Sequence, residues 1–364
     1  MTLLIFQTLT KSKNKLPKKH SPLLSSKEGI KGWISPEFSI IIPNYNGSQF
    51  LDDCLYSLYQ AIKQCSGNFE IIIVDNGSQD NSLKITKNFF DQYRSSKMSA
   101  GIYRLNSNTG FANAVNFGIN KSKYKYIVLC NNDLMLEKDW FQLISGAIKN
   151  NQDPKVTTFF GTVLTKDGTK FESQGLKFSI KGKAENISNG KPFHKSTIHH
   201  LPSIKLAWGT SAALVVYQKD IIQKIGLFDS DFFAYQEDVD IALRLNKLKY
   251  KTLYIPKAIC YHLGGGTSDK MGTIRSYLSF RNWFLIIIKN YSFNDIKSNF
   301  LPIIIERLKN FSYLTKSIYQ TRHLLSLAII PITAIKVTLE LLFLTPKMLN
   351  KRFQFQKLVK SIKL

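Results

Sequence analysis

From Phe38 to Asn150, short apolar runs alternate with amphipathic stretches of helical length, and this alternation restricts the fold more than any other feature. The predicted strands are Phe38–Ile42, Glu70–Val74, Ile102–Leu105 and Tyr126–Cys130, and the predicted helices cover roughly residues 48–64, 80–93, 110–121 and 138–149. Strand ends recur at roughly 30-residue intervals, the size of one strand–helix–strand unit. Near-continuous β-branched strands are typical of a parallel sheet covered on both faces. An α/β sheet is therefore predicted over about residues 37–150.

The pattern changes after residue 150. Val156–Val163, Ala207–Tyr217 and Thr252–Ile255 are predicted strands, and the Gly- and Lys-rich residues 166–200 are predicted hairpins and loops. The first strand is not followed by G-x-G-x-x-G, and the chain has no G-x-x-x-x-G-K-[ST], so neither a dinucleotide fingerprint nor a P-loop is present.

The chain is strongly basic, with 50 Lys and Arg against 25 Asp and Glu and a net charge of +25. This charge predicts an anionic partner such as nucleic acid, anionic lipid or a phosphorylated substrate. The basic residues gather in the terminal segments and no recognised nucleic-acid motif is present, so we do not expect nucleic-acid binding. The cysteines, at positions 54, 65, 130 and 260, have neither CxxC nor zinc-finger spacing, and we expect reduced thiols in a cytosolic protein.

Residues 1–36 read as a basic flexible tail, because lysines, Pro and Ser dominate and no apolar period is present. The apolar run from Leu3 to Phe6 is short and follows no basic residue, so we expect no signal peptide.

Each strand of the N-terminal half ends in a polar, turn-forming cluster. These clusters are Pro43-Asn44-Tyr45-Asn46-Gly47, Asp75-Asn76-Gly77-Ser78, Asn106-Ser107-Asn108-Thr109-Gly110 and Asn131-Asn132-Asp133. Turn chemistry alone explains any one of them. In an open parallel sheet, however, ligands bind beyond the carboxyl ends of the strands, so four clusters in register predict a shared polar cleft. There Tyr45 offers an aromatic face, Asp75 a hydrogen-bond acceptor, and Asp133 a ligand for a hard divalent cation.

Five acidic residues lie within twelve positions, from Asp229 to Asp240, which we call the acidic segment. Concentrated carboxylates repel one another, so a role beyond solubility is expected. Glu237-Asp238, with aromatic residues nearby, is a candidate base and its neighbour at a reaction centre. The alternative is that Asp238 or Asp240 caps the helix predicted from Val239 onward.

His262 follows a predicted strand and precedes Gly264-Gly265-Gly266. A lone histidine is usually structural. Glycines beside it allow close approach of backbone to a phosphate and loop movement, which favours a functional role.

These motifs together resemble family 2 glycosyltransferases with the GT-A fold, especially the rhamnosyltransferase-like branch. The resemblance runs from about Phe38 to Arg281. Each motif alone is weak evidence for the family, and the resemblance depends on the order and spacing of all of them. Beside the strand-end clusters, they are the run Asn108 to Gly118, Trp208-Gly209-Thr210, Glu237-Asp238-Val239-Asp240 and His262 with its glycines. The resemblance implies a GT-A domain over residues 37–281, with a Rossmann-like mixed sheet and a helical C-terminal extension.

The resemblance also implies a role for each motif. A nucleotide-diphosphate sugar would contact Pro43, Tyr45, Asn46, Asp75, Asn108, Gly110, Asn131, Asn132, Trp208, Gly209 and Thr210. Asp133 and His262 would hold Mg²⁺ or Mn²⁺ on the diphosphate. Asp238 would be the catalytic base, with Glu237 beside it.

Asn131 departs from the family pattern, because it stands at the first acid of the D-x-D motif and removes one negative charge. An asparagine still hydrogen-bonds ribose or ligates weakly. The substitution motivates an alternative, a non-catalytic nucleotide-sugar-binding or membrane scaffold, against which the retained Glu237-Asp238 pair argues.

Residues 282–364 form an apolar and basic extension that we expect to be helical. Leu324–Leu344 is largely apolar but contains Pro331, Lys336 and Glu340, and charges are costly at the centre of a bilayer. Lys347–Lys363 spaces basic residues among apolar ones, as in helices on anionic membranes. An interfacial or re-entrant helix pair is favoured over a true span, and a helical hairpin that covers the catalytic domain is the alternative.

The predicted function is inverting transfer of a sugar from a nucleotide-diphosphate sugar to a hydroxyl. The predicted acceptor is a growing, lipid-linked cell-surface polysaccharide or glycolipid at the cytoplasmic face of the membrane. Rhamnose, galactofuranose, galactose and glucose all remain open as the donor sugar.

Overall fold

The computed structural model describes residues 36–93, 95–194, 204–264, 272–322 and 326–363. The predicted basic tail lies outside these ranges except for its last residue, as do the second and third glycines after His262. The predicted role of the tail in solvent or at a membrane therefore stays a prediction.

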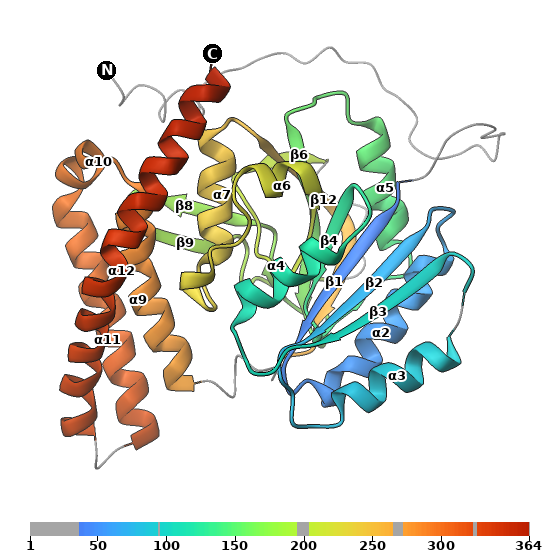
Figure 1. Cartoon of the computed structure of the whole chain (residues 1–364), viewed down its shortest axis with the longest axis horizontal. Helices are drawn as coiled ribbons and strands as arrows, with labels where there is room; N and C mark the ends of the chain where they lie inside the picture. The colour runs from blue at the N-terminus through green and yellow to red at the C-terminus, as the bar shows by residue number, and fades with distance from the viewer. Residues whose placement is uncertain (1–35, 94, 195–203, 265–271, 323–325, 364) are drawn as a thin grey trace. The chain divides into compact units, whose positions relative to one another are not determined.

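The alternation predicted for the N-terminal half is confirmed (Figure 1). The elements are β1 (Phe38–Asn44), α2 (Ser48–Lys63), β2 (Phe69–Asp75), α3 (Ser82–Gln92), β3 (Met98–Arg104), α4 (Phe111–Lys121), β4 (Tyr126–Cys130) and α5 (Trp140–Asn150). β3 begins four residues before the predicted start at Ile102 and pairs with β2 along its whole length. Its first residues are partly or fully exposed, so they carry little of the apolar signal that marks a buried strand.

The remaining elements complete a mixed sheet, as the resemblance implied. They are β5 (Leu134–Leu136), β6 (Val156–Thr165), β7 (Phe171–Ser173), β8 (Leu176–Ser179), β9 (Lys183–Asn186), β10 (Lys205–Ala207), β11 (Leu214–Gln218), α6 (Lys219–Lys224), η3 (Ser230–Phe232), α7 (Glu237–Lys247) and β12 (Lys251–His262). Among the described residues, the strand order is β10-β12-β6-β11-β4-β1-β2-β3, with β5 beside β12 and β7 beside β6. β1 pairs in parallel with β2 and β4, whereas β11 runs antiparallel to both β4 and β6.

β11 and β12 also differ from their predicted bounds. β12 continues to His262 instead of ending at Ile255, because its pairing with β6 resumes at Ile259 after an irregularity that contains Pro256. β11 starts at Leu214 and not at Ala207. The intervening residues leave the sheet, and Gly209 instead packs so closely on α7 that an added Cβ would lie 2.7 Å from Ala242.

The sheet is buried between helices on both faces. Ile40 and Ile42 of β1 pack with α2 and α5, while Ile41 packs with α4 and α7 on the other face. This alternation follows from the two-residue period of a strand. The helices on both faces explain why the strands are apolar throughout.

The C-terminal extension is helical, as predicted. It contains α9 (Gly272–Asn290), α10 (Phe293–Ser298), α11 (Phe300–Arg322) and α12 (Ser326–Lys363). Both α11 and α12 pack along α9 (Figure 1). Within the described chain, one helical stretch, Ala328–Ile362, is long and apolar enough to cross a bilayer by length and composition.

Candidate active site

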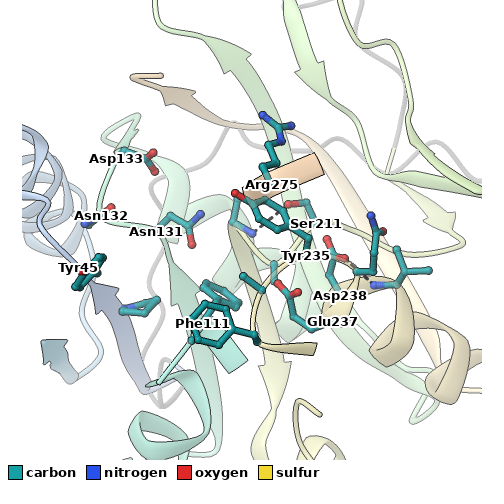
Figure 2. Close-up of a pocket in the computed structure, with 18 of the residues that line it drawn as sticks. Tyr45, Phe111, Asn131, Asn132, Asp133, Ser211, Tyr235, Glu237, Asp238 and Arg275 are labelled. Atoms are coloured by element: carbon teal, nitrogen blue, oxygen red, sulfur yellow. Dashed lines mark hydrogen bonds between the residues drawn. The ribbon is translucent and has the colours of Figure 1, made fainter. Parts of the chain in front are cut away.

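A cavity of about 480 Å³ opens at the carboxyl ends of β1, β2 and β4, where the sequence predicted a polar cleft. Ten of the predicted site residues line it: Pro43, Tyr45, Asn108, Gly110, Asn131, Asn132, Asp133, Glu237, Asp238 and His262. Figure 2 shows Tyr45 and the Asn131–Asp133 cluster on one side and the Glu237–Asp238 pair on the other. The chain thus brings residues more than a hundred positions apart around one space.

Asparagine side chains hold the strand ends together on the β1–β2 side of the cavity. Asn44 donates to Asp75 Oδ1 at 3.2 Å and accepts from Asn132 Nδ2 at 2.6 Å. Asn76 donates to the Asn108 side chain at 3.0 Å and to the carbonyl of Gly110 at 3.1 Å. These bonds fix the relative positions of four strand-end loops before any ligand binds.

Gly110 is required at its position for two reasons. Its φ is +88°, in the region that side chains rarely adopt, and an added Cβ would lie 2.6 Å from the carbonyl oxygen of Phe233. The loop that ends β3 therefore approaches the acidic segment closely, with the amide of Ala112 donating to Phe233 at 3.3 Å.

Asp75 and Asn46 do not line the cavity. Asp75 is completely buried, accepts from Asn44 and from the amide of Ser78, and has Arg104 Nε 3.7 Å away. Asn46 points to the α3 side, where its Oδ1 accepts from the amide of Gln79 at 2.8 Å. Both side chains support the loops that carry Asn44, Tyr45 and Asn76.

Trp208, Gly209 and Thr210 are also absent from the cavity lining, and the residues that follow them, Ser211 to Ala213, take that place. Trp208 stacks on Phe178, with ring centroids 4.8 Å apart. The predicted border of the sugar site is thus shifted by three residues, because the chain turns into β11 only after Gly209 has packed against α7.

The Asn131-Asn132-Asp133 cluster presents side-chain oxygens that lack protein partners. Asn131 Oδ1 and Asp133 Oδ1 are buried and have no hydrogen-bond partner among the described residues. Orphaned buried oxygens are costly, so they indicate a missing ligand. The oxygens are of the type that Mg²⁺ and Mn²⁺ prefer.

His262 lies between two carboxylates. Its Nε2 is 3.1 Å from Asp133 Oδ2, and its Nδ1 is 2.7 Å from Glu172 Oε1. Burial alone would lower the pKa of His262, but the hydrogen bonds to Asp133 and Glu172 raise it to about 10. The imidazole must give up a proton to ligate a metal through Nε2.

A divalent cation fits this side of the cavity, although the described residues do not contain a cluster of three or more His, Cys, Asp or Glu arranged for a metal. Asp133 offers an unpaired oxygen, and His262 offers Nε2 on the same side. Glu172 binds the opposite ring nitrogen, the arrangement that commonly orients histidine ligands. A protein site with two ligands leaves room for phosphate oxygens and water.

Glu237 and Asp238 begin α7, opposite the asparagine cluster. Burial, followed by the charge of Asp238, raises the pKa of Glu237 to about 8. Burial also raises the pKa of Asp238 to about 6, against hydrogen bonds from the amides of Val239 and Ala212 that favour its ionised form. The two buried carboxyls titrate as a pair, and burial together with their mutual repulsion favours one proton shared between them near neutral pH.

The alternative reading of the acidic segment as a helix cap is wrong. The residue that caps α7 is Gln236, whose side chain makes no capping hydrogen bond. Asp240 lies inside the helix, completely buried, and pairs with Arg244 at 2.6 Å and Lys289 at 2.8 Å. Asp229 also pairs with Lys289, at 2.6 Å. Two of the five acids are thus neutralised in the core.

Residues 39–200 match the sequence model of the family described as Glycosyl transferase family 2. The match covers less than half of the chain, so it assigns these residues, and not the whole chain, to a family 2 domain. Asn131–Asp133 lies within the matched residues, whereas Glu237, Asp238 and His262 lie beyond them. The rhamnosyltransferase-like branch is not distinguished by this match.

Curated relatives of the family 2 domain include a poly-beta-1,6-N-acetyl-D-glucosamine synthase from Staphylococcus epidermidis, 27% identical over 227 residues. The same enzyme of Staphylococcus aureus is 26% identical. Each alignment covers 62% of this chain and 49% of the relative, so the chain spans about half the length of these proteins.

Solved structures with the same GT-A fold include S. aureus TarS 1-349 in complex with UDP-GlcNAc. Its TM-score is 0.50 at 14% identity, and the match covers 90% of this chain and 91% of that one. GalNAc-T7 with UDP, GalNAc and Mn²⁺ also has a TM-score of 0.50, at 15% identity, with 70% of this chain and 48% of that chain covered. At this identity the likeness establishes the fold of the family 2 domain.

The side chains of the cavity lining that the sequence did not predict include Glu172, Tyr235 and Arg275. Glu172 lies in the stretch predicted as hairpins and loops, where no periodic signal singled it out. Arg275 belongs to α9, and its guanidinium lies 5.8 Å from the centre of the Tyr235 ring. An arginine at this edge adds positive charge beside the acidic segment.

Proposed function

We propose that this protein is an inverting glycosyltransferase that moves a sugar from a nucleotide-diphosphate sugar to a hydroxyl group. The observation that carries the proposal is the meeting of Asp238, Asp133 and His262 in the lining of one cavity of a family 2 domain. The names of the relatives make UDP-linked N-acetylglucosamine the first donor to test, beside nucleotide-linked rhamnose and hexoses.

The donor lies along the β1–β2 side in this proposal. Tyr45 and Pro43 contact the base, and Asn108 with Gly110 lies along the nucleotide. Asn131 and Asn132 contact the ribose or diphosphate. The hydrogen bonds from Asn76 to Asn108 and from Asn132 to Asn44 support this assignment, because they hold these loops in place without a ligand. Asp75 does not contact the nucleotide base directly. It accepts a hydrogen bond from Asn44, which faces the cavity.

Asp238 acts as the base. Its carboxylate takes the proton of the acceptor hydroxyl as the acceptor oxygen bonds to the anomeric carbon and the bond from that carbon to the diphosphate breaks. A base works best when its pKa lies near the working pH, and Asp238, with a pKa raised to about 6, meets this condition. Glu237 stays protonated beside it, so that the pair carries one negative charge.

Asp133 and His262 hold the divalent cation, Mg²⁺ or Mn²⁺. When bound, the cation stabilises negative charge on the departing diphosphate. Asp133 Oδ1 supports this role because it is buried and lacks a partner among the described residues. Glu172 keeps His262 oriented, and Arg275 lies at the same cavity as a further positive charge.

In this proposal the extension contacts an anionic membrane at its cytoplasmic face, where a lipid-linked glycan would be the acceptor. Large apolar side chains exposed at helical spacing on α12 include Ile332, Ile335, Leu339, Leu342 and Phe343. On α11, exposed apolar side chains include Phe300, Leu301, Ile305 and Leu308. An exposed apolar stripe with flanking lysines is typical of interfacial helices.

Peripheral or re-entrant attachment is favoured over a span by the contacts of α12. Glu340 pairs with Arg281 at 2.9 Å, Lys351 pairs with Asp231 at 2.7 Å, and Met348 is completely buried. The later residues Phe355, Leu358 and Val359 pack against the core of the sheet domain. A span through Ala328–Ile362 would carry these contacts into hydrocarbon, where ion pairs and domain packing are lost.

The deciding experiment screens nucleotide sugars for thermal stabilisation with and without Mn²⁺, and then measures transfer or hydrolysis of the binders. A ligand that binds only the folded state raises its apparent stability. Metal-dependent stabilisation by a nucleotide sugar, together with turnover of that sugar, supports the proposed glycosyltransferase activity. Stabilisation without transfer or hydrolysis would favour the non-catalytic scaffold that Asn131 motivates.

A further inference from the structure

Just before Glu237 and Asp238, the backbone of the acidic segment has positive φ angles, which residues other than glycine rarely adopt. Phe233, Tyr235 and Gln236 have φ values of +65°, +68° and +70°, and none of them is glycine. A non-glycine residue at such a φ is strained, so the surrounding structure must hold the conformation. The strain lies immediately before the proposed base.

Asn282 of α9 holds this backbone. Its side chain is completely buried, and Nδ2 lies 2.9 Å from the carbonyl oxygen of Phe232, 2.8 Å from that of Ala234 and 2.7 Å from that of Tyr235. One amide group thus serves as donor to three carbonyls of the segment. An apolar residue of the same size fills the space but removes this donor from the carbonyls of Ala234 and Tyr235.

Arg281, the neighbouring residue, completes the contact. Its Nε donates to Asn282 Oδ1 at 3.0 Å and so orients the amide. Its Nη2 donates to the carbonyls of Asp231 at 3.1 Å and Phe232 at 2.9 Å. Because Nη1 bonds to Glu340 of α12 at 2.9 Å, the contact is anchored in the C-terminal extension.

Ion pairs hold the two ends of the segment, and Lys289 takes part at both ends. At the start, Asp229 pairs with Lys289, and Asp231 pairs with Lys351. At the end, Asp240 pairs with Arg244 and Lys289. Between these ion pairs, Arg281 and Asn282 donate hydrogen bonds to main-chain carbonyls of the segment. These bonds hold the path of the backbone and do not neutralise its carboxylates.

We propose that Arg281 and Asn282 are positioning residues, which hold residues 232–236 in their strained path so that Glu237 and Asp238 face the cavity. The inference rests on the proposed function. It gives the helical extension a second role beside membrane contact, because α9 and α12 then belong to the catalytic unit.

The test compares Asn282→Leu with Asn116→Leu. Asn116 is a matched control, because its side chain also donates to a backbone carbonyl, that of Phe228 at 2.7 Å, but it does not line the cavity. We expect both variants to lose thermal stability. In Asn282→Leu, kcat falls by about 10²-fold while the affinity for UDP-GlcNAc with Mn²⁺ stays close to wild type, because the base is displaced and the donor loops are not. In Asn116→Leu, kcat stays close to wild type.

A second readout does not depend on activity. Hydrogen–deuterium exchange over residues 232–238 should be faster in Asn282→Leu and unchanged in Asn116→Leu. Wild-type kcat with unchanged exchange in Asn282→Leu overturns the inference, and so does an equal loss of kcat in the two variants.

A third variant, Glu340→Gln, covers the case in which Asn282→Leu does not fold. Glu340 is partly exposed, so the change releases the outer anchor of Arg281 at little cost in packing. Faster exchange over residues 232–238 together with a lower kcat supports the inference. If neither exchange nor kcat changes, the inference is wrong. If wild type transfers no sugar from any donor, the proposed function fails, and exchange alone decides whether the two residues hold the segment.

Discussion

The imidazole Nε2 of His262 lies 3.1 Å from Oδ2 of Asp133, although 129 positions separate the two residues. β12 and β5 pair antiparallel, with His262 opposite Leu134, and this register brings the histidine to the end of the Asn131–Asp133 cluster. The proposed metal ligands are thus positioned by sheet pairing and not by a local motif.

Metal dependence is the first prediction. Excess chelator should abolish transfer, and added Mn²⁺ or Mg²⁺ should restore it. His262→Gln should weaken Mn²⁺ binding measured by calorimetry by at least about tenfold, since even loss of an outer-shell partner has effects of that order. The control is His194→Gln, at an exposed position outside the cavity lining. Full activity in excess chelator would remove the metal from the mechanism.

The second prediction concerns Asp238→Asn. The variant should bind the donor as wild type does and lose transfer by about 10²–10⁴-fold, because the acceptor proton has no base to receive it. Asp220→Asn, at an exposed position on α6, should retain activity. Retained turnover of Asp238→Asn with an authentic acceptor would exclude Asp238 as the base.

The pH dependence of transfer is the third prediction. Since burial raises the pKa of Asp238 to about 6, the base is protonated and inactive below that pH and ionised above it. We expect kcat/KM to rise as pH increases through about 6 and then to level off. The profile should be recorded with saturating metal. A flat profile across that range would contradict the assignment.

The fourth prediction concerns the buried ion pairs. Lys289 Nζ lies 2.6 Å from Asp229 Oδ2 and 2.8 Å from Asp240 Oδ2. Lys289→Met removes this shared partner of the two carboxylates. Removing one member of a buried network typically costs about 3–5 kcal/mol of unfolding free energy. Lys251→Met breaks an exposed pair with Asp153 and should cost less than about 1 kcal/mol. Denaturant unfolding measures both, and equal losses would show that burial does not matter here.

Membrane contact provides the fifth prediction. Leu342→Glu with Phe343→Glu places charge on the exposed stripe of α12 and should reduce co-sedimentation with anionic phosphatidylglycerol vesicles, while donor binding stays unchanged. Salt should weaken binding of wild type to these vesicles. The control, Asp52→Asn on α2, is exposed on the sheet domain. If wild type sediments with neither vesicles nor cell membranes, the proposed location is wrong.

Much of the fold could be predicted from the sequence because its signals are local. β-branched strands and amphipathic helices at βαβ spacing define the sheet over β1 to β4, and polar residues at the strand ends define its ligand edge. The apolar, basic composition after Arg281 was enough to indicate a helical extension. Each of these features depends on neighbours within a few turns of chain.

Tertiary structure alone decided how the acidic segment is used. The resemblance to a family singled out Asp238, but no local pattern in the sequence explains why Asp240 is neutralised by Arg244 and Lys289 while Asp238 lies at the cavity. The difference arises because α7 turns successive side chains to different faces, and only packing against α9 determines which face is buried. The same holds for Glu172, whose carboxylate gains its place beside His262 through pairing of distant strands that no local pattern encodes.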